Sequence, residues 1–424
     1  RSIKGLSRRD RTMIIYSPFM GLFAFMMAYW WLLILTSIAA GGAVAAMAAI
    51  APKAIKGEPK SLSSLRASMA ITALAIVLAG IGVFIGVAWL FAYIFGFSFG
   101  ASAGVYLVTS AVIFTFFIIL IQWLLSPFFI NLAYRAHPPK TPEEKRYQAM
   151  LDEVAKRSHI KAPKLRIAET NIPNAFSYGS PVSGSYVAVT RGLLNLMPDE
   201  EVEAVLGHEV GHLRHRDVSW ILALSVIPLA VYYLGQMLIW SGFFGGMGGG
   251  GEGRGRNGGG GGALLLALVG IVLVMAGVVF RFLVGNFNRL REYYADANSA
   301  MVTSPRRIQR ALARLHIAVE GNSYFKHQVN SSTNSTLKAL FIVAPFVEIN
   351  GGFLYEPDED AWPWRRRMEP DLSRYRNYDV DQLIEKIKNE KTDPVQEIFA
   401  THPPIPKRLR FIDNIKYTVN PLEA

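Results

Sequence analysis

Residues 208–212 read His-Glu-Val-Gly-His, in which two histidines are separated by three residues and a glutamate follows the first. On a helix, side chains four positions apart lie one turn apart on the same face, so both imidazoles can bind one metal ion. Glu209 then faces the open ligand position, where it can act as a general base. A helix is expected here because Pro198 and the acidic residues after it suit a first turn, and apolar residues follow at helical intervals. The pattern predicts a catalytic zinc site with His208 and His212 as ligands.

The composition indicates a membrane protein. Of the 424 residues, 51% are hydrophobic and only 18% are charged, which is too apolar for an ordinary soluble enzyme. The net charge is +12, but the basic residues flank apolar blocks, which favours a role in membrane topology and argues against nucleic-acid binding. The chain has no cysteine, so any metal must be bound by histidine and carboxylate side chains.

Four stretches lack any Asp, Glu, Lys or Arg: residues 12–52, 67–134, 218–251 and 257–280. A membrane span needs about 20 apolar residues, so the second stretch is long enough for two helices that turn near 97–102. The third and fourth stretches predict one helix each. The first fits either one span followed by a small-residue tail or two short legs of a hairpin.

These stretches divide the chain into five expected regions of a mainly α-helical membrane protein with a small β-sheet. In the first half of the catalytic domain, residues 141–159 have the pattern of an amphipathic helix, and 164–167 and 185–190 read as strands around a turn-rich centre. Residues 379–391 again show helical periodicity. The regions are an N-terminal extension with the first membrane segment (1–66), a transmembrane hairpin (67–134), the first half of the catalytic domain (135–217), a second transmembrane hairpin with a glycine-rich loop (218–285), and the second half of the domain (286–424).

The positive charges predict the orientation. Arg135, Arg214 and Arg281 belong to a basic group close to the apolar blocks, whereas the opposite side offers only Arg254 and Arg256. Because basic residues favour the cytoplasmic side, the catalytic domain is expected to face the cytoplasm.

The third metal ligand is expected from residues 291–296, Arg-Glu-Tyr-Tyr-Ala-Asp. Glu292 is the candidate ligand. Asp296 lies one helical turn later on the same face, where it can accept a hydrogen bond from a liganding imidazole and fix its tautomer. The alternative, a solvated acidic face paired with Arg289 and Arg291, is outweighed by the His-Glu-Val-Gly-His motif.

Of the other histidines, only His402 stands near a second functional group. It is followed by Arg408, and together they could approach the site and stabilise an oxyanion. His215 lies between Arg214 and Arg216 in what reads as a basic turn, and is interpreted as structural. The remaining histidines have no partner pattern and are interpreted as surface or core residues; they are His137, His159, His316 and His327.

Several motifs occur in the order found in the HtpX family of membrane zinc metalloproteases, which is related to the CaaX prenyl-protein endopeptidases, and the chain resembles that family. The resemblance implies a gluzincin-type protease fold with a cytoplasmic active site, cleavage of misfolded membrane proteins, and a location of His402 and Arg408 near the catalytic cleft. The N-terminal residues and an insertion at 346–397 depart from the pattern and bear on substrate choice. The matching residues are Asn174-Ala175-Phe176 with Gly179, 187–194, Glu200-Glu201-Val202, 207–212, Asp217, Arg291-Glu292 with Ala295-Asp296, and Thr401-His402-Pro403 with Arg408.

The predicted function is a multi-pass membrane zinc endopeptidase that acts in protein quality control on polypeptide substrates. Zinc would be bound by His208, His212 and Glu292, with Glu209 as general base and later as proton donor to the leaving amine. The substrate would lie as an extended strand against Asn174, Ala175 and Phe176. The alternatives are a prenyl-protein processing endopeptidase with the same chemistry, or a membrane chaperone or scaffold with structural zinc. A transporter is disfavoured because the apolar blocks contain no charged residue.

Overall fold

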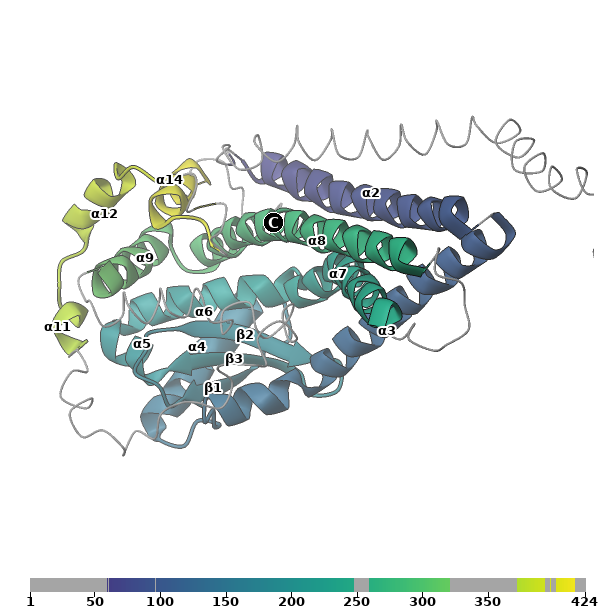
Figure 1. Ribbon diagram of the computed structural model, residues 1–424. Helices are drawn as coiled ribbons and strands as arrows, with labels where there is room; N and C mark the ends of the chain where they lie inside the picture. Colours follow the sequence, from purple (N-terminus) through teal and green to yellow (C-terminus); the bar gives the residue numbers. More distant parts are fainter. Residues whose placement is uncertain are drawn as a thin grey trace, which may run out of the picture. The chain divides into compact units, whose positions relative to one another are not determined.

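The computed structural model describes residues 59, 61–95, 97–247, 259–320, 372–392, 397 and 402–415 (Figure 1). The chain divides into two compact units, and each is described separately. One comprises residues 1–51, 74–114 and 227–277, and the other comprises 52–73, 115–226 and 278–424. The first apolar stretch, the glycine-rich residues 248–258, and residues 321–371 of the second half lie outside the described residues.

Four long helices are apolar enough to cross a membrane, as expected from the second, third and fourth uncharged stretches. They are α2 (Leu62–Phe95), α3 (Phe97–Ala133), α7 (Asp217–Met247) and α8 (Gly259–Val302), with candidate spans over Leu62–Trp89, Val105–Ala133, Ser219–Gly242 and Leu266–Val302. The span in α3 is only 17% buried, and its exposed large side chains include Tyr106, Phe114 and Leu132. Such a surface suits lipid rather than water.

Within the first unit, α7 and α8 pack closely at two glycines. A Cβ atom added to Gly235 would lie 2.8 Å from the carbonyl oxygen of Gly270, and one added to Gly270 would lie 2.6 Å from that of Gly235. The absence of both side chains lets the two backbones come together, which is the usual way in which membrane helices associate.

The second unit contains a three-stranded sheet in the order β1-β3-β2, formed by β1 (Lys164–Ala168), β2 (Ala175–Ser180) and β3 (Gly184–Thr190). β1 pairs with β3 in parallel and β2 pairs with β3 antiparallel. The predicted strands at 164–167 and 185–190 are confirmed. The expectation of a turn-rich centre between them is wrong for residues 175–180. Pairing with β3 holds this segment extended, and its aromatic residues Phe176 and Tyr178 suit a strand, although its other four residues are Ala, Ser or Gly.

The two faces of the sheet have different partners. Alternate residues of β1 and β3, such as Leu165 and Val187, join a core with α4 (Pro142–Arg157), α5 (Arg191–Leu196) and α6 (Asp199–Arg214). On the other face, Tyr178, Tyr186 and Ala188 pack against Ile130 of α3. The sheet therefore lies between the helices of the catalytic domain and the end of a membrane helix.

Helix α8 crosses the expected boundary near residue 285. This helix continues without interruption to Val302, so one 44-residue element contains both a membrane span and Glu292. It is followed by α9 (Pro305–Glu320), α11 (Ser373–Arg376), α12 (Asp381–Lys388), which agrees with the periodicity at 379–391, and α14 (Ile405–Ile415). Likewise, α2 begins at Leu62, ahead of the expected boundary at 67.

Candidate metal centre

Helix α6 presents the two histidines on a buried face. Pro198 is its N-cap, and Asp199, Glu200 and Glu201 fill the first turn, where carboxylates interact favourably with the helix dipole. The helix runs to Arg214, so His208 and His212 are one turn apart, and each is less than a tenth exposed. In Figure 1, α6 lies between the sheet and α8.

Two glycines of α6 allow α8 to approach the histidines. A Cβ atom on Gly211 would lie 2.9 Å from Cα of Ala295, and one on Gly207 would lie 3.2 Å from Cα of Ser299. Hydrogen bonds stabilise this contact: the side-chain amide of Asn298 donates to the carbonyl of Gly207 (2.8 Å), and the hydroxyl of Ser299 donates to that of Ala204 (2.6 Å). The guanidinium of Arg214 also donates to the side-chain oxygen of Asn298 (3.1 Å). The close packing of the two helices is what brings Glu292 to the histidines.

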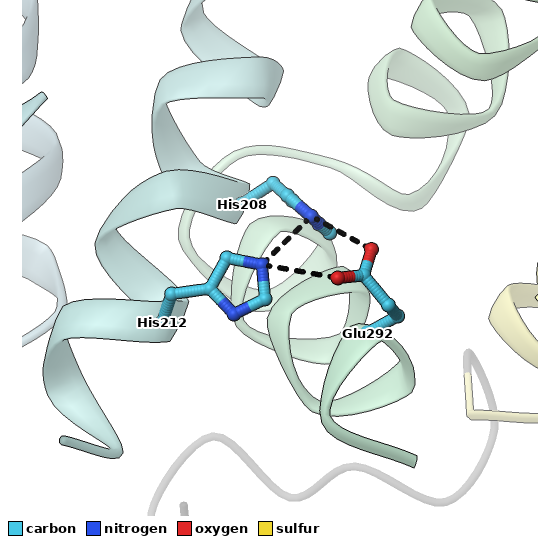
Figure 2. Close-up of side chains that lie close together, drawn as sticks. All are labelled: His208, His212 and Glu292. Atoms are coloured by element: carbon cyan, nitrogen blue, oxygen red, sulfur yellow. Dashed lines mark hydrogen bonds and ion pairs between the residues drawn. The ribbon is translucent and has the colours of Figure 1, made fainter. Parts of the chain in front are cut away.

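The side chains of His208, His212 and Glu292 point toward one another (Figure 2). The Nε2 atoms of the two histidines are 3.2 Å apart. A carboxylate oxygen of Glu292 lies 3.5 Å from Nε2 of His208, and the other lies 3.6 Å from Nε2 of His212. All three residues are buried. Two imidazoles and one carboxylate that converge in this way form a donor set for a divalent metal ion.

Each imidazole contacts a buried carboxylate through its other nitrogen. Nδ1 of His208 lies 3.0 Å from Oδ1 of Asp296, and Nδ1 of His212 lies 2.7 Å from Oδ2 of Asp217. When Nδ1 carries the proton and donates it to the carboxylate, Nε2 keeps its lone pair for the metal. Asp296 therefore lies beside His208, a candidate metal ligand. Asp217 has the equivalent position for His212.

Basic side chains neutralise these carboxylates. Arg408 of α14 binds Asp296 through two nitrogens, at 2.8 Å and 2.6 Å, and Nε of Arg291 lies 3.0 Å from Asp217. Burial alone would raise the pKa of Asp217, but the hydrogen bond from His212 and the charge of Arg291 hold it below its usual value. Burial opposes the charge of Arg408 as well, yet the Asp296 carboxylate raises the pKa of this guanidinium above its usual range.

The structure brings His402 and Arg408 to the same carboxylate that faces the histidines. Nδ1 of His402 lies 2.8 Å from Glu292 and Nη1 of Arg408 lies 3.6 Å from it. The His402 side chain is 55% exposed, whereas that of Arg408 is only 10% exposed. His402 is thus the group at this site that a substrate can reach from solvent, and Arg408 is buried behind it.

The remaining predicted residues have clear positions. Glu209 is buried on α6 between the two histidines. Asn174 immediately precedes edge strand β2, and Ala175 and Phe176 begin it; α6 packs against this strand. His215 caps α6: its ring Nδ1 bonds to the carbonyl of Gly211 (2.8 Å) and the ring packs on Tyr294, so it does not join the metal ligands.

Asp217 is the functional residue that reasoning from residue types did not assign. A sequence signal was available, since it is the first carboxylate after the motif, at the start of an uncharged stretch where an unpaired acid would be costly. His137 and His316 pair with Glu169 and Glu390 and take no part in the site. His159 has a positive φ of 57° at the turn after α4, and His327 lies outside the described residues.

Residues 141–416 match the model of peptidase family M48. The chain belongs to this family. A relative from Aeropyrum pernix described as "Protease HtpX homolog" is 46% identical over 306 residues, which cover 72% of this chain and 85% of the relative. "Protease HtpX homolog 2" from Saccharolobus solfataricus is 36% identical over 83% of this chain and 97% of its own length.

A solved structure, "Crystal Structure of S. mikatae Ste24p", matches 83% of this chain and 67% of its own with 15% identity and a TM-score of 0.44. This likeness is too distant to support an argument. Membership of the M48 family, the HtpX homologues and the four membrane helices identify the protein as a multi-pass membrane metalloendopeptidase that acts on polypeptides.

Proposed function

We propose that the M48 site of this protein binds zinc through His208, His212 and Glu292. The observation that carries this proposal is the spacing of the three ligand atoms, 3.2, 3.5 and 3.6 Å. Bonds of 2.0–2.1 Å in a tetrahedral site give an edge of about 3.4 Å between ligand atoms. Two histidines and a glutamate, with no cysteine in the chain, are also a typical ligand set of catalytic zinc, which leaves a fourth position open.

Bound zinc would supply a Lewis acid that polarises the scissile carbonyl and makes water a nucleophile near neutral pH. Glu209 is the general base in this proposal: it takes a proton as water attacks and returns it to the leaving amine. Asp296 and Asp217 hold His208 and His212 in the tautomer that leaves Nε2 free. His402, half exposed beside Glu292, donates a hydrogen bond to the developing oxyanion. Arg408 adds positive charge and holds Asp296 in place.

The substrate is proposed to bind as an extended strand along β2, beginning at Asn174, Ala175 and Phe176. This strand is at the edge of the sheet and packs against α6, so its backbone can pair with a peptide of any sequence. Broad sequence tolerance suits an enzyme that removes misfolded or damaged membrane proteins. The catalytic domain is proposed to face the cytoplasm, because the residues flanking its membrane helices carry the larger share of positive charge.

The test is the substitution Glu209→Gln in the purified, detergent-solubilised protein. We expect it to retain one zinc ion per chain, measured by metal analysis, while hydrolysis of unfolded casein falls by about 10²–10⁴-fold, the usual contribution of a general base. Full activity of this variant would contradict the role of Glu209. Glu292→Gln, in contrast, should lose the metal.

The same preparation can separate the proposal from prenyl-protein processing. The wild-type protein should cleave unfolded casein and should show no preference for a farnesylated peptide over the same peptide without the lipid. Cleavage restricted to the farnesylated peptide would instead support the processing endopeptidase.

A further inference from the structure

Strand β2 lies at one edge of the sheet. Its hydrogen bonds to β3 show which of its residues direct their backbone groups away from the sheet. The backbone amide of Thr190 donates to the carbonyl of Asn174 (3.0 Å), so the backbone groups of Asn174 point toward β3. In an antiparallel pair the direction alternates from residue to residue. Ala175, Ser177 and Gly179 therefore direct their backbone N–H and C=O groups away from β3, where a peptide substrate would pair with them.

One of these outward groups is already occupied. The indole Nε1–H of Trp123, in membrane helix α3, donates to the carbonyl oxygen of Gly179 at 3.0 Å. This bond is independent evidence that Gly179 faces outward. Among the described residues, no comparable partner is recorded for the outward backbone groups of Ala175 or Ser177, so the edge is free at its start and closed at its end.

The contact between α3 and β2 is held at several points. The hydroxyl of Tyr178 donates to the side chain of Asn131 at 2.6 Å, and Tyr178 packs with Ile130 of α3. Gly179 lies close to β3 and leaves no room for a side chain, because a Cβ atom there would lie 2.4 Å from the carbonyl oxygen of Gly184. These contacts hold the indole of Trp123 against β2.

We propose that Trp123 ends the substrate-binding edge of β2 at Ser177 and so limits how far a peptide can pair with the sheet. This inference rests on the proposed binding of substrate along β2 and makes Trp123 a specificity-determining residue contributed by a membrane helix. A substrate strand pairs with Ala175 and Ser177, whose outward groups are two residues apart, and must then leave the sheet where α3 begins to cover it.

A backbone N-methyl scan of a cleaved peptide tests this proposal, because each N-methyl group removes one donor from the substrate. In the wild-type protein, N-methylation should lower kcat/KM on the order of 10-fold at the two positions, two residues apart, that pair with the carbonyls of Ala175 and Ser177. Methylation two residues further toward α3 should have no effect. In Trp123→Phe the Gly179 carbonyl is released, and this third position should become sensitive.

The matched control is Trp220→Phe, which removes a 56% exposed indole from α7 and should retain the wild-type pattern. A wild-type protein already sensitive at the third position would overturn the proposal, as would a Trp123→Phe pattern identical to that of wild type. If Trp123→Phe fails to fold, Trp123→Leu replaces it. The scan of the wild-type protein alone still shows whether the third position is insensitive to N-methylation. If no position is sensitive in the wild type, binding along β2 itself fails, which is a different result.

Discussion

At the scale of single residues, His402 is the group that links solvent to the metal site. Its side chain is half exposed, yet Nδ1 lies 2.8 Å from Glu292. For His402→Ala we expect kcat to fall by about 10²–10³-fold, the usual cost of losing one oxyanion donor. Metal content and KM should change little, because His402 is not one of the three ligands. Steady-state kinetics measure kcat and KM, and metal analysis measures the metal content.

His316→Ala provides the control for that substitution, because His316 pairs with Glu390 away from the site and its loss should leave kcat unchanged. Loss of metal from His402→Ala, rather than loss of turnover, would mean that this histidine serves Glu292 and not the substrate.

In the proposed site, Asp217 orients His212 for the metal. Its carboxylate is only 2% exposed, accepts from Nδ1 of His212 and is paired with Arg291. For Asp217→Ala we expect metal affinity to fall by about 10–100-fold, the typical effect of removing such a partner. A competition assay with a zinc-binding dye measures this without reference to activity.

Asp152→Asn, on the exposed surface of α4, is the control. The Asp152 carboxylate accepts a hydrogen bond from Gln148 and is not next to a histidine of the site, so the substitution should leave zinc affinity unchanged. Equal affinities in Asp217→Ala and wild type would show that packing alone orients His212.

At the scale of elements, the contact between α6 and α8 decides whether a metal site exists. In Gly211→Ala the new methyl group would lie 2.9 Å from Cα of Ala295, a backbone atom that cannot turn aside. We expect the helices to separate, metal affinity to fall at least 10-fold, and stability to fall by about 1–3 kcal/mol, as in other overpacked contacts. Zinc titration and thermal unfolding in detergent measure these effects.

Gly86→Ala is the matched control for Gly211→Ala. A Cβ atom at Gly86, in the middle of α2, meets nothing within 4 Å, so the substitution should be neutral or slightly stabilising through helix propensity. Similar losses in both variants would indicate a general intolerance of helix substitution rather than a specific close contact.

The start of α4 predicts a pH dependence of stability. The side chain of Glu144 accepts from the backbone N–H of Lys140 (2.6 Å) and Thr141 (3.2 Å) and also pairs with Arg191. Burial opposes its ionisation, but these donors lower the pKa of Glu144 from 4.5 to about 2. Because the folded pKa is the lower one, the stabilisation is complete above pH 4.5 and is lost as the pH falls toward 2.

Glu144→Gln should therefore lower the free energy of unfolding by about 1–3 kcal/mol at pH 7, as expected for hydrogen bonds to a charged group. The difference in Tm from wild type should narrow as the pH is lowered from 6 to 3. Glu143→Gln, at the exposed neighbouring position, should show no such trend. A constant difference across this range would mean that Glu144 contributes by shape and not by charge.

At the scale of the whole molecule, the metal site joins two segments that the chain separates by a membrane hairpin. Local patterns predicted the helix of His208 and His212 and the strands on either side of β2, because these depend on residue periodicity within a few turns. The four spans were predicted from the length of the stretches without charged residues. The residue pattern of β2 alone reads as a turn, because its conformation depends on pairing with β3, although the substrate hypothesis already placed an edge strand at Asn174, Ala175 and Phe176. The continuity of α8 past residue 285 agrees with the short spacing of Glu292 from Arg281, which predicts a ligand helix that continues into the membrane hairpin. Asp217 was missed, since its role depends on where the chain turns after Arg214.

Metal binding should consequently stabilise the fold as well as enable catalysis. His208 and His212 belong to α6 and Glu292 belongs to α8, so a bound ion would tie together two helices that otherwise meet through glycines, side-chain hydrogen bonds and the contact of His208 with Asp296. At a zinc concentration 1,000 times the Kd, a native state that binds one ion gains about 4 kcal/mol. The measurement is best made with Glu209→Gln, which avoids self-cleavage while it keeps all three ligands. Chelation should lower the Tm of Glu209→Gln, and added zinc should restore it. Glu292→Gln, which lacks one of the three ligands, should keep a low Tm both with chelator and with added zinc. If zinc leaves the Tm of Glu209→Gln unchanged, the native state does not bind the ion more tightly than the unfolded chain does, and the proposed ligand set of His208, His212 and Glu292 would be contradicted.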